Sequence, residues 1–69
     1  MNVEINISDE FITLGDLLKY SGFVMTGGEA KKMIKEGLVK VNDEIEERRG
    51  RKVYKGDIVT VETKTIHVY

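Results

Sequence analysis

The spacing of apolar residues changes along the chain, and each spacing predicts a different element. Apolar and polar residues alternate across 2–7, which indicates a strand with one buried face. Three leucines on one face then predict a short amphipathic helix over 14–20, ending near Gly22. Thr13 is the expected N-cap of this helix, with Asp16 completing a capping box.

A second helix is predicted over 27–36. Thr26 is its expected N-cap, and Glu29, three residues later, forms a capping box with it. Gly37 supplies the left-handed residue that commonly ends such a helix. The apolar residues fall at the i, i+3 and i+4 positions of one face, namely Ala30, Met33 and Ile34.

After the second helix the polarity alternates with a period of two. The predicted strands are 38–42, a weak one at 44–46, 58–62 and an edge strand at 66–69. Val53 and Tyr54 are expected to enter the core, and Phe11 and Ile12 lead into the first helix. Two adjacent helices among short strands predict an α+β fold, two helices on a mostly antiparallel sheet of four or five strands. Residues 1–69 are expected to form one domain.

Composition limits the class of protein. A chain of 69 residues is near the lower size limit for a core that is stable by itself. It has no cysteine and therefore neither a disulfide nor a thiolate metal site. The first ten residues resemble no secretory signal, and no apolar run is long enough to span a membrane. We therefore expect a cytoplasmic protein with no membrane partner.

The net charge of −1 conceals an uneven distribution. Residues 1–30 carry a balance of −4, whereas residues 31–55 carry nine bases against five acids. Because charges are screened within about 8 Å in physiological salt, the local field steers a ligand more than the net charge does. This asymmetry predicts a polyanionic partner.

The bases form two clusters. The second helix carries Lys31, Lys32 and Lys35, which could contact phosphates or simply face solvent. The segment 47–52 holds three arginines around a glycine, and planar guanidinium groups suit phosphate oxygens, although a basic loop can also serve solubility. Backbone N–H groups of Gly27 and Gly28 offer a further anion site, or only a capping turn.

No constellation of side chains indicates catalysis. The single histidine, His67, has no metal-ligand spacing around it, and no nucleophile stands beside a base. The tyrosines form no paired platform of the kind that single-strand binders use. Glu46 and Glu47 are expected to make exposed ion pairs with neighbouring arginines. We expect no enzyme activity, metal, cofactor or small-molecule substrate.

The stretch from about 12 to 62 resembles the RNA-binding domain named after small-subunit ribosomal protein S-four, also called the αL motif. The resemblance rests on a helix start, a helix end, a strand and turn, and a closing turn. The helix start is matched by Thr26 and Ala30, and the helix end by Ile34 and Gly37. The strand and turn are matched by Val39, Val41 and Asn42, and the closing turn by Gly56, Asp57, Ile58 and Val59. The chain is most similar to the small stand-alone YaaA-type branch.

Two positions depart from the family pattern. Gly27 stands where many members have an RNA-contacting arginine, and Asp43 replaces the turn glycine. Aspartate tolerates turn geometry, and backbone N–H groups with Lys31 can take the arginine's place. The resemblance implies a bacterial protein that binds structured RNA, ribosomal RNA above all, in ribosome maturation or large-subunit assembly. The expected RNA-binding residues are Thr26, Gly27, Gly28, Lys31, Lys32, Lys35, Lys40, Asn42, Arg48, Arg49, Arg51 and Lys52.

An alternative is a protein-interaction module of β-grasp type, because the segments around 41–45 and 56–62 also suit small sulfur-carrier proteins. Those carriers end in Gly-Gly, whereas this chain ends in His67, Val68 and Tyr69, so carrier chemistry is not expected. RNA binding and protein binding remain the two hypotheses, and RNA affinity discriminates between them.

Overall fold

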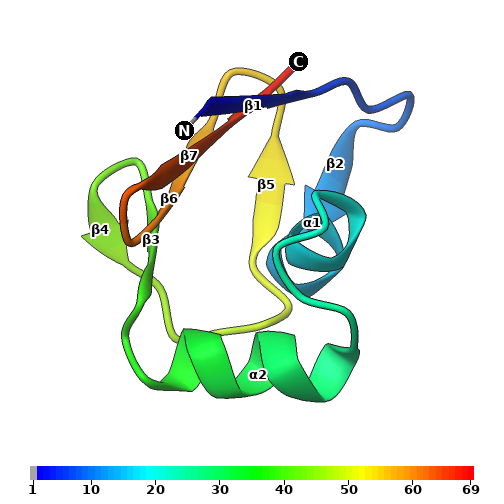
Figure 1. Cartoon of the computed structure of the whole chain (residues 1–69). Helices are drawn as coiled ribbons and strands as arrows, with labels where there is room; N and C mark the ends of the chain where they lie inside the picture. Colours follow the sequence, from blue (N-terminus) through cyan, green and yellow to red (C-terminus); the bar gives the residue numbers. More distant parts are fainter. Residues whose placement is uncertain (1) are drawn as a thin grey trace.

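The computed structural model describes residues 2–69 (Figure 1). This part of the chain contains two helices and seven strands. In order they are β1 (Asn2–Ile5), β2 (Phe11–Thr13), α1 (Leu14–Tyr20), α2 (Gly27–Lys35), β3 (Val39–Val41), β4 (Glu44–Ile45), β5 (Lys52–Tyr54), β6 (Ile58–Val61) and β7 (Lys64–Val68).

The strands form two sheets. A five-stranded sheet has the order β1-β7-β6-β3-β4, and β2 pairs with β5 in a separate antiparallel ribbon. Within the larger sheet only β1 and β7 run parallel, while the other neighbouring pairs are antiparallel. The predicted α+β class, with two helices and a mostly antiparallel sheet, is therefore confirmed.

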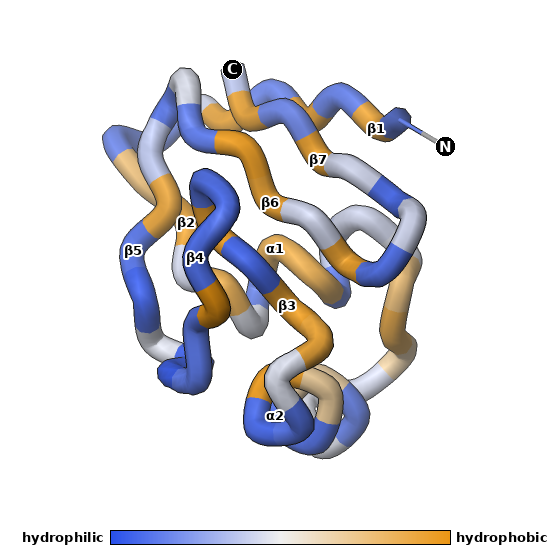
Figure 2. The backbone as a smooth tube through the Cα atoms, turned by 90° about the vertical axis from the view of Figure 1, so that its left-hand side faces the viewer, coloured by the Kyte–Doolittle hydropathy of each residue, from blue (hydrophilic) through white to orange (hydrophobic). Residues whose placement is uncertain are grey.

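The core lies between the sheet and the helices. The three leucines of α1 are completely buried, as are Ala30 and Ile34 of α2, whereas Met33 is only partly buried. Valines of β3 and β6 face the helices from the sheet, as the alternating burial along these strands requires. Figure 2 shows hydrophobic stretches in β3, β6 and α1, and a hydrophilic connection between β4 and β5.

Several predicted boundaries are shifted. The first strand ends at Ile5 instead of residue 7, and β7 begins at Lys64, two residues before its predicted start and directly after a tight turn from β6. Antiparallel pairing of Val61 with Lys64 leaves only two residues for this turn, and Glu62 adopts a positive φ of 57° there. The other predicted ends lie within one residue of the observed ones.

The β2–β5 ribbon was not predicted. Phe11 and Ile12 do not merely lead into a helix but pair with Tyr54 and Val53. Val53 is buried as expected, whereas the prediction that Tyr54 enters the core is wrong, because 42% of its surface is exposed. Alternation along β5 directs Val53 inward and its two neighbours outward.

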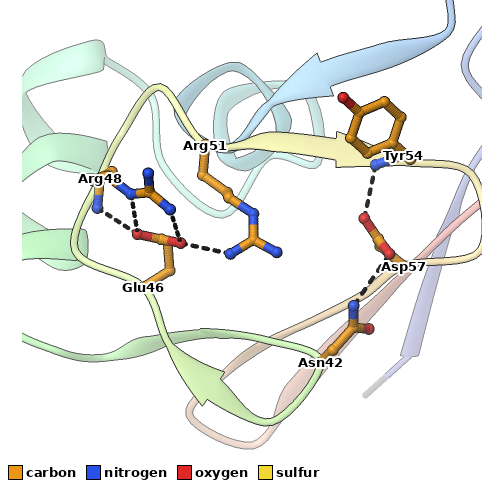
Figure 3. A network of polar contacts seen from close by, with 6 residues as sticks. All are labelled: Asn42, Glu46, Arg48, Arg51, Tyr54 and Asp57. Carbon is orange, nitrogen blue, oxygen red and sulfur yellow. Dashed lines mark hydrogen bonds and ion pairs between the residues drawn. The ribbon is translucent and has the colours of Figure 1, made fainter.

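Two turns are joined through Asn42. Its backbone and that of Asp43 have positive φ values of 51° and 71°. The Asn42 amide donates to Asp57 Oδ1 over 3.1 Å, and its carbonyl oxygen accepts the Ile58 N–H over 3.0 Å. The other carboxylate oxygen of Asp57 accepts the Tyr54 N–H over 2.8 Å (Figure 3). The start of β6 and the end of β5 are thereby held beside the β3–β4 turn.

Candidate nucleic-acid interface

Residues 46–51, here called the basic loop, connect β4 to β5 and run along α2 towards α1 (Figure 1). The loop is bonded to the start of α1. The Leu14 N–H donates to the Arg51 carbonyl over 2.8 Å, and the Gly15 N–H donates to the Arg49 carbonyl over 3.0 Å. The first amides of a helix have no partner within the helix, so the loop carbonyls satisfy two of them.

This arrangement corrects the predicted capping box at α1. Thr13 precedes the helix in an extended conformation, but its side chain makes no capping hydrogen bond. The box is not formed there because the basic loop supplies the acceptors. The cap of α1 is therefore a tertiary contact, which also fixes the loop.

Glu46 organises the loop from inside. It accepts hydrogen bonds from the Arg48 backbone over 3.1 Å, from Arg48 Nε over 3.0 Å and from Arg51 Nη1 over 2.6 Å (Figure 3). The expectation of an exposed ion pair is wrong for Glu46, because only 9% of its side chain is exposed. Its N–H also bonds to the Val39 carbonyl, which ties the loop to β3.

The charge of Glu46 is held firmly. Hydrogen bonds from the Arg48 side chain, with one from Arg51 and one from the Arg48 backbone, lower the pKa of Glu46 from 4.5 to about 2, although burial acts in the opposite direction. The same pairing raises the pKa of Arg48. The Glu46 carboxylate thus compensates part of the positive charge of the loop. Arg49, in contrast, has no acidic partner among residues 2–69.

Arg49 bridges the two helices. Its side chain lies across Gly15 so closely that a Cβ at that position would lie 2.5 Å from Arg49 Cγ. Its guanidinium reaches the start of α2, where a Cβ built on Gly27 would lie 4.0 Å from Nη1. A cavity of about 350 Å³ opens here, and Lys19 and Asp16 of α1 also line it. Arg49 therefore lies where both helices begin.

The start of α2 has free backbone donors, and its first residue, Gly27, lines this cavity. Thr26 Oγ1 accepts the Glu29 N–H over 3.2 Å, which confirms Thr26 as the N-cap. Within residues 2–69 the N–H groups of Gly27 and Gly28 have no acceptor, and neither residue has a side chain that would cover them. Together with Arg49, these donors suit an anion such as a phosphate.

The lysines of α2 divide between two flanks. Lys31 and Lys35 follow Gly27 at intervals of four residues, so they continue its face along the helix, and both are exposed. Lys32 lies on another flank, in an apolar groove with Phe23, Glu29 and Glu36. Two of the three lysines of α2, Lys31 and Lys35, therefore lie on the same face of the protein as Arg49.

The remaining predicted site residues lie elsewhere. Lys40 belongs to β3 and lines a hollow with Thr60 and Glu62. The side chain of Asn42 is occupied by Asp57 and Ile58 within the protein. Arg48, Arg51 and Lys52 line a second cavity, of about 550 Å³, which shares Gly50 with the Arg49 cavity.

Sequence reasoning missed three residues of this region. Gly15 supports Arg49, and Lys19 lines the cavity, where it pairs with Asp16 over 3.5 Å. Tyr54 lines the second cavity. The alternation of Lys52, Val53 and Tyr54 would have placed it outward.

The described residues offer neither a metal site nor a membrane span. No three His, Cys, Asp or Glu side chains within 2–69 are arranged to hold a metal ion. In the same range neither helix has the length and apolar character that crossing a bilayer requires.

The known proteins to which this chain is similar include a curated relative and two solved structures. The relative is the "probable ribosome maturation protein RlbA" of Bacillus subtilis (strain 168), 50% identical over 58 residues, which cover 84% of this chain and 82% of that protein. The solution structure of YbcJ from E. coli, described as having an αL motif involved in RNA binding, has a TM-score of 0.74 and 31% identity. It covers 96% of this chain and 85% of YbcJ.

The crystal structure of a pseudouridylate synthase also has a TM-score of 0.74, at 21% identity. The match covers 81% of this chain but 24% of the synthase, so what the two share is a fold that forms a small part of that enzyme. The family of S4 domains matches residues 5–69, nearly the whole chain. The protein belongs to the S4 domain family.

Proposed function

We propose that this protein binds structured RNA without catalysing a reaction on it, and that it acts in ribosome maturation. Membership of the S4 domain family supports RNA as the ligand. The name of the Bacillus relative supports the process, and the motif described for YbcJ supports the binding mode. These relationships favour RNA over the alternative of a protein-interaction module.

The observation that carries the proposal is the position of Arg49. Its guanidinium has no acidic partner among residues 2–69 and lies beside Gly27, at the start of α2. A guanidinium offers planar donors that match phosphate oxygens, and a helix start adds a favourable dipole. Lys31 and Lys35 extend this face by two helical turns, which suits consecutive phosphates of one RNA strand.

The basic loop is prepared before RNA arrives. Its carbonyls are bonded to α1, and Glu46 fixes two arginines, so little conformational entropy is lost on binding. The single negative charge of Glu46 also offsets one of the two positive charges of Arg48 and Arg51. Among the predicted contacts, Arg49, Lys31 and Lys35 therefore form the primary phosphate site, with Gly27 and Gly28. Lys32 and Lys40 are secondary, and Thr26 and Asn42 support the backbone.

The finer assignment is ribosomal RNA of the large subunit, in the cytoplasm. It rests on the resemblance to the small stand-alone YaaA-type branch and on the ribosome maturation named for the relative. Crosslinking in cells, followed by sequencing of the attached RNA, identifies the ligand. Enrichment of RNA from the small subunit alone would contradict the large-subunit assignment and leave RNA binding intact.

The direct test is titration of large-subunit ribosomal RNA with three variants. Arg49→Ala should weaken binding about tenfold or more, the scale of one hydrogen bond to a charged group. Gly15→Ala should act in the same direction, since its Cβ would displace the Arg49 side chain. Lys64→Ala, in the β6–β7 hairpin, removes an equal charge outside the site and should change affinity less than twofold. Equal effects of Arg49→Ala and Lys64→Ala would refute the proposed site.

A further inference from the structure

The exposed aromatic ring of Tyr54 lies beside the basic loop. Tyr54 stands opposite Phe11 in the β2–β5 ribbon, and their ring centroids are 5.9 Å apart with an interplanar angle of 54°. Lys52 Nζ lies 4.9 Å from the centroid of the Phe11 ring, so this lysine lies over Phe11. The tyrosine is thus supported on one side and exposed to solvent by 42% of its surface.

A cavity of about 550 Å³ adjoins this ring, lined by Tyr54, Lys52, Arg51, Gly50 and Arg48. Its volume lies within the range of small-molecule sites, roughly 300–1,000 Å³. Three cations surround it, and the single carboxylate of Glu46 compensates only part of their charge. The surroundings therefore favour a ligand that combines a negative charge with a flat apolar face.

A nucleotide has both properties. Its base can stack on an aromatic ring, and its phosphate attracts guanidinium and ammonium groups. An acidic peptide would satisfy the charges but would not need an exposed tyrosine. The cavity is also distinct from the Arg49 cavity, because the residues that line the two differ apart from Gly50.

We propose that Tyr54 is a stacking platform for one unpaired RNA base, with Arg48, Arg51 and Lys52 around the adjacent phosphate. The inference rests on the proposed RNA-binding function and specifies the class of RNA. A base inside a continuous duplex has no free face to offer, so the ligand must contain a bulged or looped-out nucleotide next to a helix. The Arg49 face would hold the helix while the Tyr54 site holds the extruded base.

The test uses two RNA hairpins with the same stem, one fully paired and one with a single bulged 2-aminopurine. The parent protein should bind the bulged hairpin more tightly by about 5- to 150-fold, the range for one base stacked on an aromatic side chain. The fluorescence of 2-aminopurine should fall on binding, since stacking quenches it. This fluorescence signal requires no variant.

Three substitutions locate the effect. Tyr54→Leu keeps an apolar side chain but removes the ring, so the preference for the bulge and the quenching should both disappear. Tyr54→Phe should retain both. Tyr69→Leu is the matched control, because Tyr69 is half-exposed and lies outside the cavity, and it should behave as the parent does. Thermal melting of each variant verifies that the fold is retained.

The outcomes separate this inference from the function on which it rests. If the parent binds both hairpins equally, or if Tyr54→Leu retains the preference, the stacking site is refuted. In that case a tenfold loss with Arg49→Ala on both hairpins still supports RNA binding through phosphates. If the parent binds neither hairpin nor ribosomal RNA, the proposed function fails together with the stacking site.

Discussion

Glu46 links the stability of the protein to the shape of its basic loop. A carboxylate with 9% of its side chain exposed is unfavourable unless its oxygens are satisfied. Here one oxygen accepts from Arg48 and the other from Arg51 and Arg48, so the charge is retained inside the loop. The residue therefore acts on RNA only indirectly, by setting where the two arginines lie.

Replacing Glu46 with Gln should lower stability in a pH-dependent way. The pKa of Glu46 is about 2 in the folded protein and 4.5 as the ordinary value, so its stabilising effect is complete above about pH 5. It is lost as the pH falls from about 4.5 towards 2. Because Arg48 is exposed, we expect the effect to be about 1–2 kcal/mol, below what the full shift implies.

Urea unfolding of the parent and Glu46→Gln at several pH values measures this difference. The gap between the two proteins should be largest near neutral pH and close gradually below about pH 4. Glu47→Gln is the control, since Glu47 is an exposed neighbour. A gap that is constant from neutral pH to about pH 2 would contradict the role given to the Glu46 charge.

At the scale of elements, α2 combines two tasks on two faces. Ala30 and Ile34 are completely buried against the core, whereas Lys31 and Lys35 are exposed on the face that continues from Gly27. The helix has only nine residues, and helices of this length are marginal without tertiary packing. The position of the phosphate-binding face therefore depends on the buried residues.

Ile34→Ala should destabilise the domain by about 2–5 kcal/mol, because it leaves a cavity in a completely buried site. A domain of this size is expected to have only about 3–5 kcal/mol of stability, so much of the protein should unfold. Circular dichroism during thermal melting measures the loss. Met25→Ala, at a residue that is 87% exposed, should leave the melting temperature nearly unchanged. Similar curves for both variants would refute the packing described for α2.

At the scale of the whole molecule, a net charge of −1 coexists with a positive surface. Residues 1–30 carry a balance of −4, while the second helix and the basic loop carry six of the eleven bases. The fold brings the start of α2 and the basic loop together at Arg49. Affinity for a polyanion should thus depend on this face and strongly on salt.

The salt dependence of RNA affinity should give the number of phosphates that the protein neutralises. For four to six neutralised phosphates, the logarithm of affinity should fall with the logarithm of salt concentration at a slope of roughly −3 to −5. Changing Lys31 and Lys35 together to Ala should flatten the slope by up to about two units, and Arg49→Ala by about one. Lys64→Ala should preserve the slope. A slope that no substitution in the site alters would mean that RNA binds elsewhere.

The sequence by itself determined most of the elements. Both helices, the capping of α2 by Thr26 and the left-handed Gly37, with φ of 75°, follow from contacts between residues three to five positions apart. The period-two strands at 39–41 and 58–61 are local patterns as well. Such local patterns predict an element without knowledge of the rest of the chain. The two clusters of bases are likewise visible in the sequence alone.

The tertiary structure decided which residues meet. The three-residue strand Phe11–Thr13 exists because it pairs with β5, some forty residues later, and no local period marks it. Equally, Glu46 is buried and Thr13 is not a side-chain cap because the basic loop folds onto α1. The positions of Arg49 on Gly15 and of Tyr54 beside the basic loop depend on the same long-range packing. Contacts between distant segments arise from the burial of the whole core, so local sequence patterns cannot specify them.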